Sequence, residues 1–212
     1  MIAIAGGKGG CGKTTTTVAL ARSVASRTSR PVVGIDADWD MPDLHSLARV
    51  APSLSATTGS VTAPNPATQI DKRGVTVLEA PTERDHPRPR PTFERIGRTL
   101  RDATARTLID CSAGAGRDAA VPIDVATGVV LVSTGEPASL RDTAKTAAMA
   151  REVGTPILGA VLTRTDSVPK GTASLLGTER IVAVPDARRP LDSPAVRRVY
   201  DRLPALLDSQ KR

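Results

Sequence analysis

The sequence predicts an α/β fold with a mostly parallel central sheet and helices on both faces. Two features of its 212 residues indicate this. Short, β-branched apolar runs recur without polar alternation, as expected for parallel strands that are covered on both sides. Segments with helical periodicity lie between these runs, and such alternation is typical of an α/β sheet. The chain length and 40 % hydrophobic content suit one domain over residues 1–212 with a sizeable core.

The expected strands follow in chain order from their apolar runs. They cover residues 2–5, 31–35, 75–78, 107–109, 128–132, 157–162 and 181–184. The expected helices cover residues 14–26, 92–105, 138–153 and 194–208. Residues 53–74 are rich in Ser, Thr and Pro and have little periodicity, so we expect a surface excursion there. Residues 86–92 form an expected stiff, basic linker.

The first strand runs directly into a glycine-rich loop that fits G-x-x-x-x-G-K-[ST] and precedes a helix, the context that a P-loop requires. Glycines allow backbone N–H groups to surround phosphate oxygens, and the helix points its positive end at the same place. Lys13 can reach the β- and γ-phosphates, and Thr14 can bind Mg²⁺. The predicted nucleotide-binding residues are Gly7, Lys8, Gly9, Gly10, Cys11, Gly12, Lys13, Thr14 and Thr15. We prefer this P-loop NTPase interpretation to a plain glycine-rich turn.

Aspartates follow two of the expected strands, at the edge where an open parallel sheet binds its ligands. Asp110 is the candidate Walker B carboxylate, and Asp36 is its expected neighbour at a Mg²⁺ ion. Asp38 lies where a carboxylate could orient the water that attacks the γ-phosphate. The alternative for all three is an aspartate that caps a strand or helix. We expect such turn and capping roles for Asp40 and Asp43.

The net charge of +7 and the pI near 10.1 suit a protein that meets a polyanion, such as DNA or an anionic membrane surface. Arginine provides 23 of the 29 basic residues, which suits phosphate contact, although arginine-rich coding bias is an alternative. An aromatic content of 1 % argues against recognition of single strands by base stacking. We expect a cytoplasmic protein, because no apolar run approaches the roughly 20 residues of a membrane span and no signal peptide precedes the first strand.

The two cysteines, Cys11 and Cys111, match no metal-binding or CxxC spacing. We therefore expect both to be packing residues rather than redox or iron–sulfur ligands.

A simple P-loop leaves Lys8 unexplained, and this second lysine points to a family. The segment KGGCGKTTT resembles the deviant Walker A motif of MinD/ParA ATPases, whose mark is an extra lysine at the position of Lys8. DADWDMPDLH resembles the switch I segment of that family, and LIDCSAGAG resembles its Walker B and switch II region. VAVPD resembles its last-strand loop beside the nucleotide base. The likeness covers nearly the whole chain and is strongest to MinD-like proteins, particularly those of archaea.

This resemblance implies a cytoplasmic ATPase that forms an ATP-dependent homodimer, with Lys13 on its own nucleotide and Lys8 on that of the partner. Hydrolysis would release the dimer, so the protein would act as a switch that positions a cargo through an unidentified cargo or activating protein. It could work peripherally at the nucleoid or at a membrane. One alternative is a metabolic or metal-cluster ATPase on the same fold. Another is a regulatory module that binds ATP with little turnover.

Two departures from the family leave parts of this interpretation open. Relatives often place an asparagine after the sixth strand to read adenine, whereas this chain has LTRTD. Either Thr163 or Arg164 substitutes, or the base is held mainly by the backbone near Pro185 and Asp186. MinD proteins end in a membrane-lying helix, and residues 194–212 have a basic amphipathic pattern. We prefer a helix that covers the sheet, because Pro204 would interrupt a long surface helix.

Overall fold

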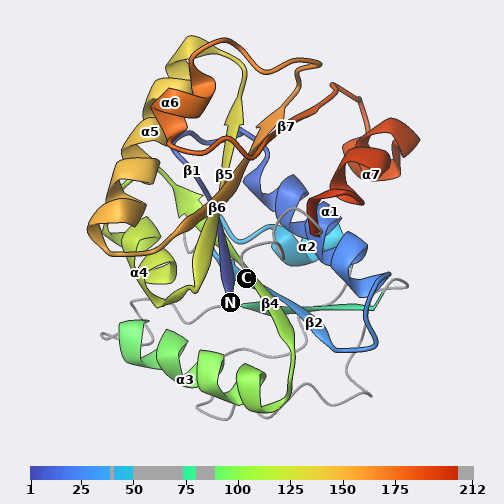
Figure 1. The fold of residues 1–212 in the computed structure, drawn as a ribbon. Coiled ribbons are helices and arrows are strands. Elements are labelled where there is room, and N and C mark those ends of the chain that lie inside the picture. Colours follow the sequence, from blue (N-terminus) through green and yellow to red (C-terminus); the bar gives the residue numbers. More distant parts are fainter. Residues whose placement is uncertain (39–40, 50–73, 80–88, 205–212) are drawn as a thin grey trace.

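The computed structural model describes residues 1–38, 41–49, 74–79 and 89–204. A parallel sheet runs through this part of the chain, with the strand order β3-β2-β4-β1-β5-β6-β7 (Figure 1). The strands are β1 (Ile2–Gly6), β2 (Val32–Ala37), β3 (Val75–Glu79), β4 (Arg106–Ala113), β5 (Gly128–Thr134), β6 (Ile157–Thr163) and β7 (Ile181–Val184). All seven expected strands are confirmed, and every pairing is parallel.

The helices are α1 (Lys13–Ala25), α2 (Leu44–Ala48), α3 (Pro89–Asp102), α4 (Arg117–Val125), α5 (Pro137–Glu152), α6 (Thr172–Leu176) and α7 (Pro194–Tyr200). A 3₁₀ turn, η2 (Pro190–Asp192), precedes α7. The sequence did not predict α2, α4 or α6. Two of these have only five residues, too few to show a helical period, and α4 contains Pro122. Helix α3 begins within the expected basic linker, and α7 ends at Tyr200, before the expected residue 208.

Several expectations fall outside the described residues. They concern Asp40, most of the 53–74 excursion, the start of the basic linker, and residues 205–212. Asp43 lies at the N-cap position of α2, as expected for a capping residue, but its side chain makes no capping hydrogen bond.

Different helices bury the two faces of the sheet, as predicted. Helices α3, α4, α5 and α6 cover one face, and α1, α2 and α7 cover the other (Figure 1). Strand β1 shows why both faces are apolar: Ala3 and Ala5 pack into the first layer, whereas Ile4 packs into the second. Because side chains alternate along a strand, a strand covered on both sides must be apolar at every position.

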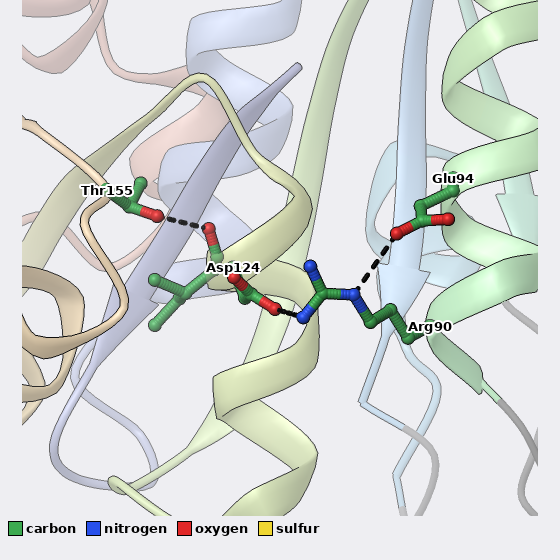
Figure 2. Close-up of polar contacts among 5 residues, drawn as sticks. Arg90, Glu94, Asp124 and Thr155 are labelled. Carbon is green, nitrogen blue, oxygen red and sulfur yellow. Dashed lines mark hydrogen bonds and ion pairs between the residues drawn. The ribbon is translucent and has the colours of Figure 1, made fainter.

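Helix α3 is held to the first layer by three buried apolar residues, Phe93, Ile96 and Leu100, and by ion pairs at its start. Phe93 is fully buried against the sheet. At the start of the helix, Arg90 pairs with Asp124 of α4 and with Glu94 one turn further on (Figure 2). The same end of α4 receives a hydrogen bond of 2.8 Å from the Thr155 hydroxyl to the Ile123 carbonyl.

We expect the buried contact to stabilise the fold more than the exposed ion pairs. Phe93→Ala should lower the free energy of unfolding by about 3–5 kcal/mol, because it removes a core aromatic and leaves a cavity. Arg90→Ala should cost less than about 1 kcal/mol, because the arginine side chain is 57 % exposed. Urea unfolding of both variants measures the difference. Equal losses would contradict this account of how α3 is held.

Candidate functional site

The candidate site lies at the carboxyl edge of the sheet, where the glycine-rich loop joins β1 to α1. Strand β1 is central, with β4 on one side and β5 on the other. Strand β2 pairs with β4 in a register that sets Asp36 directly opposite Asp110. The two predicted metal carboxylates therefore lie side by side, next to the strand that leads into the loop. This is the edge at which open parallel sheets bind ligands.

Lys13 begins α1 and is withdrawn from solvent. It is 7 % exposed, and its Nζ donates to the Lys8 carbonyl at 3.4 Å. One turn along the helix, the Thr17 hydroxyl contacts the Lys13 carbonyl at 3.1 Å and Asp110 Oδ1 at 3.0 Å. Thr17 thus connects the P-loop lysine to the Walker B aspartate. It was not predicted as a site residue, although its spacing of four from Lys13 in a run of threonines was a usable signal.

Asp110 is a buried carboxylate with an incomplete set of partners. It is 1 % exposed, and burial raises its pKa to about 7, with the charge of Asp36 also raising it. Hydrogen bonds from Thr14 and Thr17 oppose that rise. Within the described part of the chain, its second oxygen, Oδ2, has no hydrogen-bond partner. A bound cation would supply the partner that this oxygen lacks, so the site fits Mg²⁺.

Asp36 holds the segment that follows β2. Its Oδ1 accepts from the backbone N–H of Asp38 at 3.1 Å, and its Oδ2 accepts from that of Leu44 at 3.0 Å. Burial raises the pKa of Asp36 to about 6, and these two hydrogen bonds oppose the rise. Asp38 is half-buried, and its Oδ1 accepts from the backbone N–H of Met41 at 3.4 Å. Asp36 therefore fixes the position of Asp38, and a metal role for Asp36 would come in addition.

The P-loop is anchored to β5, β6 and α5. A Cβ on Gly7 would lie 2.0 Å from the Asp142 carbonyl carbon, so only glycine fits there. The Thr163 hydroxyl contacts the Cys11 carbonyl at 2.7 Å, and the Arg164 guanidinium donates to the Gly10 carbonyl at 2.9 Å. Gly12 has a φ of 94°, a backbone conformation that favours glycine. These contacts fix the position of the loop relative to β5, β6 and α5.

Both cysteines are buried and free, as the packing interpretation expects. The Cys11 thiol donates to the Val132 carbonyl at 3.4 Å, and burial raises its pKa. The pKa of Cys111 is also raised, chiefly by burial. Neither is therefore set up as a reactive thiolate.

A cavity of about 250 Å³ adjoins the P-loop on the side of β6 and β7. The four predicted base-contacting residues, Thr163, Arg164, Pro185 and Asp186, all line it, together with Gly12 and Thr15. The hydroxyl of Thr163 already contacts two carbonyls, those of Cys11 and Ser133. Because the Thr163 hydroxyl is already engaged, we prefer the alternative in which the backbone near Pro185 and Asp186 contacts the nucleotide base. This base contact stays a prediction.

Tyr200 of α7 is a site neighbour that the sequence did not reveal. Its hydroxyl lies 2.8 Å from the Thr16 hydroxyl in α1, and its ring lines the same cavity. Burial raises the pKa of Tyr200 to about 12. A contact across 184 residues leaves no local signal in the sequence.

The two lysines of the loop differ in exposure. Lys8, like Gly9 and Gly10, is exposed at the loop tip, whereas Lys13 is buried beneath it. The chain thus presents one cation inward to its own site and another outward to solvent.

The described residues do not form a complete metal site by themselves. Within residues 1–38, 41–49, 74–79 and 89–204, no three His, Cys, Asp or Glu side chains cluster as metal ligands. A cation at Asp110 would therefore need further oxygens, such as those of nucleotide phosphates and water. In the same ranges, no helix is both long and apolar enough to cross a bilayer.

Comparison with known families identifies this arrangement. The profile of the CobQ/CobB/MinD/ParA nucleotide-binding domain matches residues 2–178, which include the loop, both strand-end aspartates and β6. The chain belongs to this family. The predicted MinD/ParA resemblance is thus confirmed, and the CobQ/CobB/MinD/ParA assignment makes nucleotide binding the shared property of the site.

Relatives of this CobQ/CobB/MinD/ParA chain include archaeal proteins. An uncharacterized ATP-binding protein of Methanocaldococcus jannaschii is 31 % identical over 191 residues, which are 87 % of this chain and 71 % of that protein. The cell division ATPase MinD of Pyrococcus furiosus is 25 % identical with a TM-score of 0.79, over 99 % of this chain and 98 % of that one. MinD of Pyrococcus horikoshii, in a complex with Mg-ADP, is 21 % identical with a TM-score of 0.77, over 100 % of this chain and 95 % of that one. At this identity the likeness shows that the two chains share a fold.

The raised carboxylate pKa values predict an unusual pH dependence for protein free of metal and nucleotide. Between about pH 4 and pH 7 the folded state keeps a proton on Asp110 that the unfolded chain, with a pKa near 3.8, has released. The folded state then binds more protons, so its stability falls as pH rises through this range, by up to about 1.4 kcal/mol per pH unit.

Other carboxylates titrate in the same range, so the measured quantity is the difference in unfolding free energy between wild type and Asp110→Asn. We expect wild type to lose stability relative to this variant from pH 4 to pH 7. A difference that stays constant with pH would show that Asp110 is not held protonated by burial.

Proposed function

We propose that the chain is a single ATPase domain over residues 1–212 that binds Mg-ATP, forms a homodimer around two nucleotides and uses hydrolysis as a switch. The switch would position a cellular cargo, as the MinD/ParA resemblance implies. Family membership supports nucleotide binding. Dimerisation, hydrolysis and cargo are the parts that this proposal adds.

The unequal burial of Lys8 and Lys13 is the observation that carries the proposal. Lys13 lies under the loop with its amino group on the Lys8 carbonyl, within reach of phosphates in its own cradle. Lys8 is exposed at the loop tip, so it is accessible to a second molecule. Two ATP molecules that face each other repel strongly, and a lysine from each side would offset that repulsion. This supports a dimer in which each chain lends Lys8 to its partner.

Within one chain, Lys13, Thr14 and Asp110 would hold the nucleotide and its metal. Mg²⁺ would neutralise charge on the β- and γ-phosphates. The Thr14 hydroxyl and Asp110 Oδ2, which has no hydrogen-bond partner among the described residues, are suited to that ion, directly or through water. Asp36 would add a carboxylate beside Asp110 and keep the following segment in place.

Asp38 is the proposed residue that orients the attacking water. It is half-buried and held by hydrogen bonds at the end of β2, close to the two buried carboxylates. A carboxylate in such a place can accept a proton from water as it attacks a phosphate. Cys11 and Thr15 complete the proposed nucleotide cradle, and Thr163, Arg164, Pro185 and Asp186 its base side.

Two alternative functions are compatible with the same site. The CobQ/CobB part of the family description keeps a metabolic ATPase on this fold as a candidate. A regulatory module would bind ATP and turn it over little. An ATPase assay, with and without DNA or anionic liposomes, separates these from a surface-stimulated switch.

Substitutions of Lys13, Lys8 and Asp38 should have three different effects. Lys13→Ala should weaken ADP binding about 10- to 100-fold, because it removes a charge-assisted contact to phosphate. Lys8→Ala should bind ADP normally but remain monomeric with ATP. Asp38→Ala should bind ATP and dimerise, but its rate of ATP hydrolysis should fall about 10²–10⁴-fold. Calorimetry, sedimentation and phosphate release measure these effects, and a Lys8→Ala protein that dimerises normally with ATP would contradict the crossing lysine.

A separate prediction concerns the surface on which the dimer works. With 29 basic and 22 acidic residues, the ATP-bound protein should bind duplex DNA, and affinity should fall steeply with salt. Insertion of the C-terminal segment into a bilayer should instead leave a salt-resistant component. Cosedimentation with anionic liposomes that is lost when residues 201–212 are deleted would favour the membrane over DNA.

A further inference from the structure

Helix α5 covers one face of the sheet (Figure 1) and carries two buried threonines. Thr143 and Thr146 are both 0 % exposed and lie three residues apart, on one side of the helix. A threonine inside a helix commonly donates to a carbonyl of the preceding turn, as Thr17 of α1 does to Lys13. The hydroxyls of Thr143 and Thr146 instead contact other elements, so they supply contacts that valines of the same shape would not.

Thr143 connects α5 to the start of the P-loop. Its hydroxyl accepts from the backbone N–H of Gly7 at 3.5 Å and donates to the Val132 carbonyl of β5 at 3.3 Å. The backbones are close as well, because a Cβ on Gly7 would lie 2.0 Å from the Asp142 carbonyl carbon and 2.5 Å from the Thr143 nitrogen. The P-loop therefore begins in direct contact with α5.

Thr146 connects the same helix to the loop after β4. Its hydroxyl donates to the Gly114 carbonyl at 3.4 Å. Gly114 follows Asp110 by four residues and has a φ of 96°, a conformation that favours glycine. The N–H of Gly114 donates to the Gly6 carbonyl at 3.1 Å, directly before the residue that Thr143 contacts. One turn of α5 thus contacts both loops, and the two loops contact each other.

The hydrogen bonds from the two threonines to these loops are long. In proteins, N–H···O bonds most often measure about 2.9–3.0 Å and O–H···O bonds about 2.7–2.8 Å. The bonds of 3.5 Å from Gly7 and 3.4 Å to Gly114 can therefore shorten if either loop moves toward the helix. Both threonines are buried and β-branched, which restricts their side-chain rotation. Two fixed hydroxyls beside two loops can favour one arrangement of those loops over another.

We propose that Thr143 and Thr146 are positioning residues for the nucleotide site. Thr143 holds the P-loop for the phosphates that ADP and ATP share, and Thr146 holds the loop after β4 for the γ-phosphate. This inference rests on the proposed Mg-ATP site, in which the γ-phosphate lies at the end beside Asp110. The loop that carries Gly114 continues from the same strand as Asp110. Neither threonine touches the nucleotide, and each acts through the loop that it contacts.

The test compares the affinities of the 212-residue chain for Mg-ADP and for the non-hydrolysable analogue Mg-AMP-PNP by calorimetry. Thr146→Val keeps the shape of the side chain without its hydroxyl. It should weaken AMP-PNP binding about fivefold, a typical effect of one hydrogen bond, and leave ADP affinity unchanged. Thr143→Val should weaken the binding of both nucleotides by about the same factor. Thr143→Ser and Thr146→Ser keep the hydroxyl and should bind both nucleotides as wild type does.

Thr155→Val is the matched control. It makes the same change at a threonine that is 4 % exposed, beyond the far end of α5, whose hydroxyl donates to the Ile123 carbonyl at 2.8 Å. Urea unfolding should show a loss of stability, whereas both nucleotide affinities should stay at the wild-type value. Equal weakening of ADP and AMP-PNP by Thr146→Val, or no weakening of either, would overturn the role of Thr146. Wild-type affinities in Thr143→Val would overturn the role of Thr143.

A backbone change tests the same loop without altering the helix. Gly114→Ala should weaken AMP-PNP binding selectively, because alanine disfavours a φ of 96°, although no atom lies within 4 Å of the added Cβ. Gly154→Ala introduces the same strain at a φ of 78°, in equally open surroundings after α5, and should leave both affinities unchanged. Selective loss of AMP-PNP affinity in both glycine variants would mean that the effect is not specific to this loop, and would overturn the proposal.

The binding measurements separate this inference from the proposed switch. They need no turnover, and repeating them in a Lys8→Ala background removes the contribution of the proposed dimer. A wild type that binds both nucleotides but neither hydrolyses ATP nor dimerises would contradict the switch, while the selective effect of Thr146→Val would still support this inference. A protein that hydrolyses ATP and dimerises, but in which Thr146→Val changes neither affinity, would overturn this inference alone.

Discussion

The burial of two ionisable groups, the Lys13 amine and the Asp110 carboxyl, is the constraint on which the rest of the site depends. A charge withdrawn from water costs several kcal/mol unless other groups replace its hydration. The protein supplies only part of that replacement, through Thr14 and Thr17 on Asp110 and the Lys8 carbonyl on Lys13. One oxygen of Asp110 lacks a partner in the described structure. A nucleotide and its cation would complete both sets of contacts, so ligand binding should stabilise the fold as well as occupy the site.

The parallel sheet makes this arrangement possible. Its in-register strands set Asp36 beside Asp110, and β1 leads the chain into the loop directly next to them. Hydrogen bonds from Thr163 and Arg164 to the carbonyls of Cys11 and Gly10 hold the backbone of the loop in place. Preformed donors lose little entropy on binding, so this arrangement favours phosphate binding by the loop.

The sequence predicted the features that depend on local pattern. All seven strands, the P-loop and the two carboxylates at the strand ends could be identified, because burial on both faces and phosphate chemistry each leave a short-range signature. Helices α2 and α6 were too short to show a period. The contacts of Tyr200 with Thr16 and of Thr163 with Cys11 join residues more than 150 positions apart, so no sequence window contains them. The position of Asp36 was predicted, but its two backbone hydrogen bonds could be seen only in the fold.

The central claim is that Lys13 serves its own nucleotide and Lys8 that of the partner, and mixing two inactive variants tests it most directly. Lys8→Ala and Asp38→Ala proteins should each hydrolyse little ATP alone. In a mixed dimer, the Lys8→Ala subunit keeps its own Asp38 and receives an intact Lys8 from its partner, so one site is complete. Phosphate release should therefore partly return on mixing. Mixed dimers that form and stay inactive would contradict the account and leave Lys8 with a role only in its own subunit.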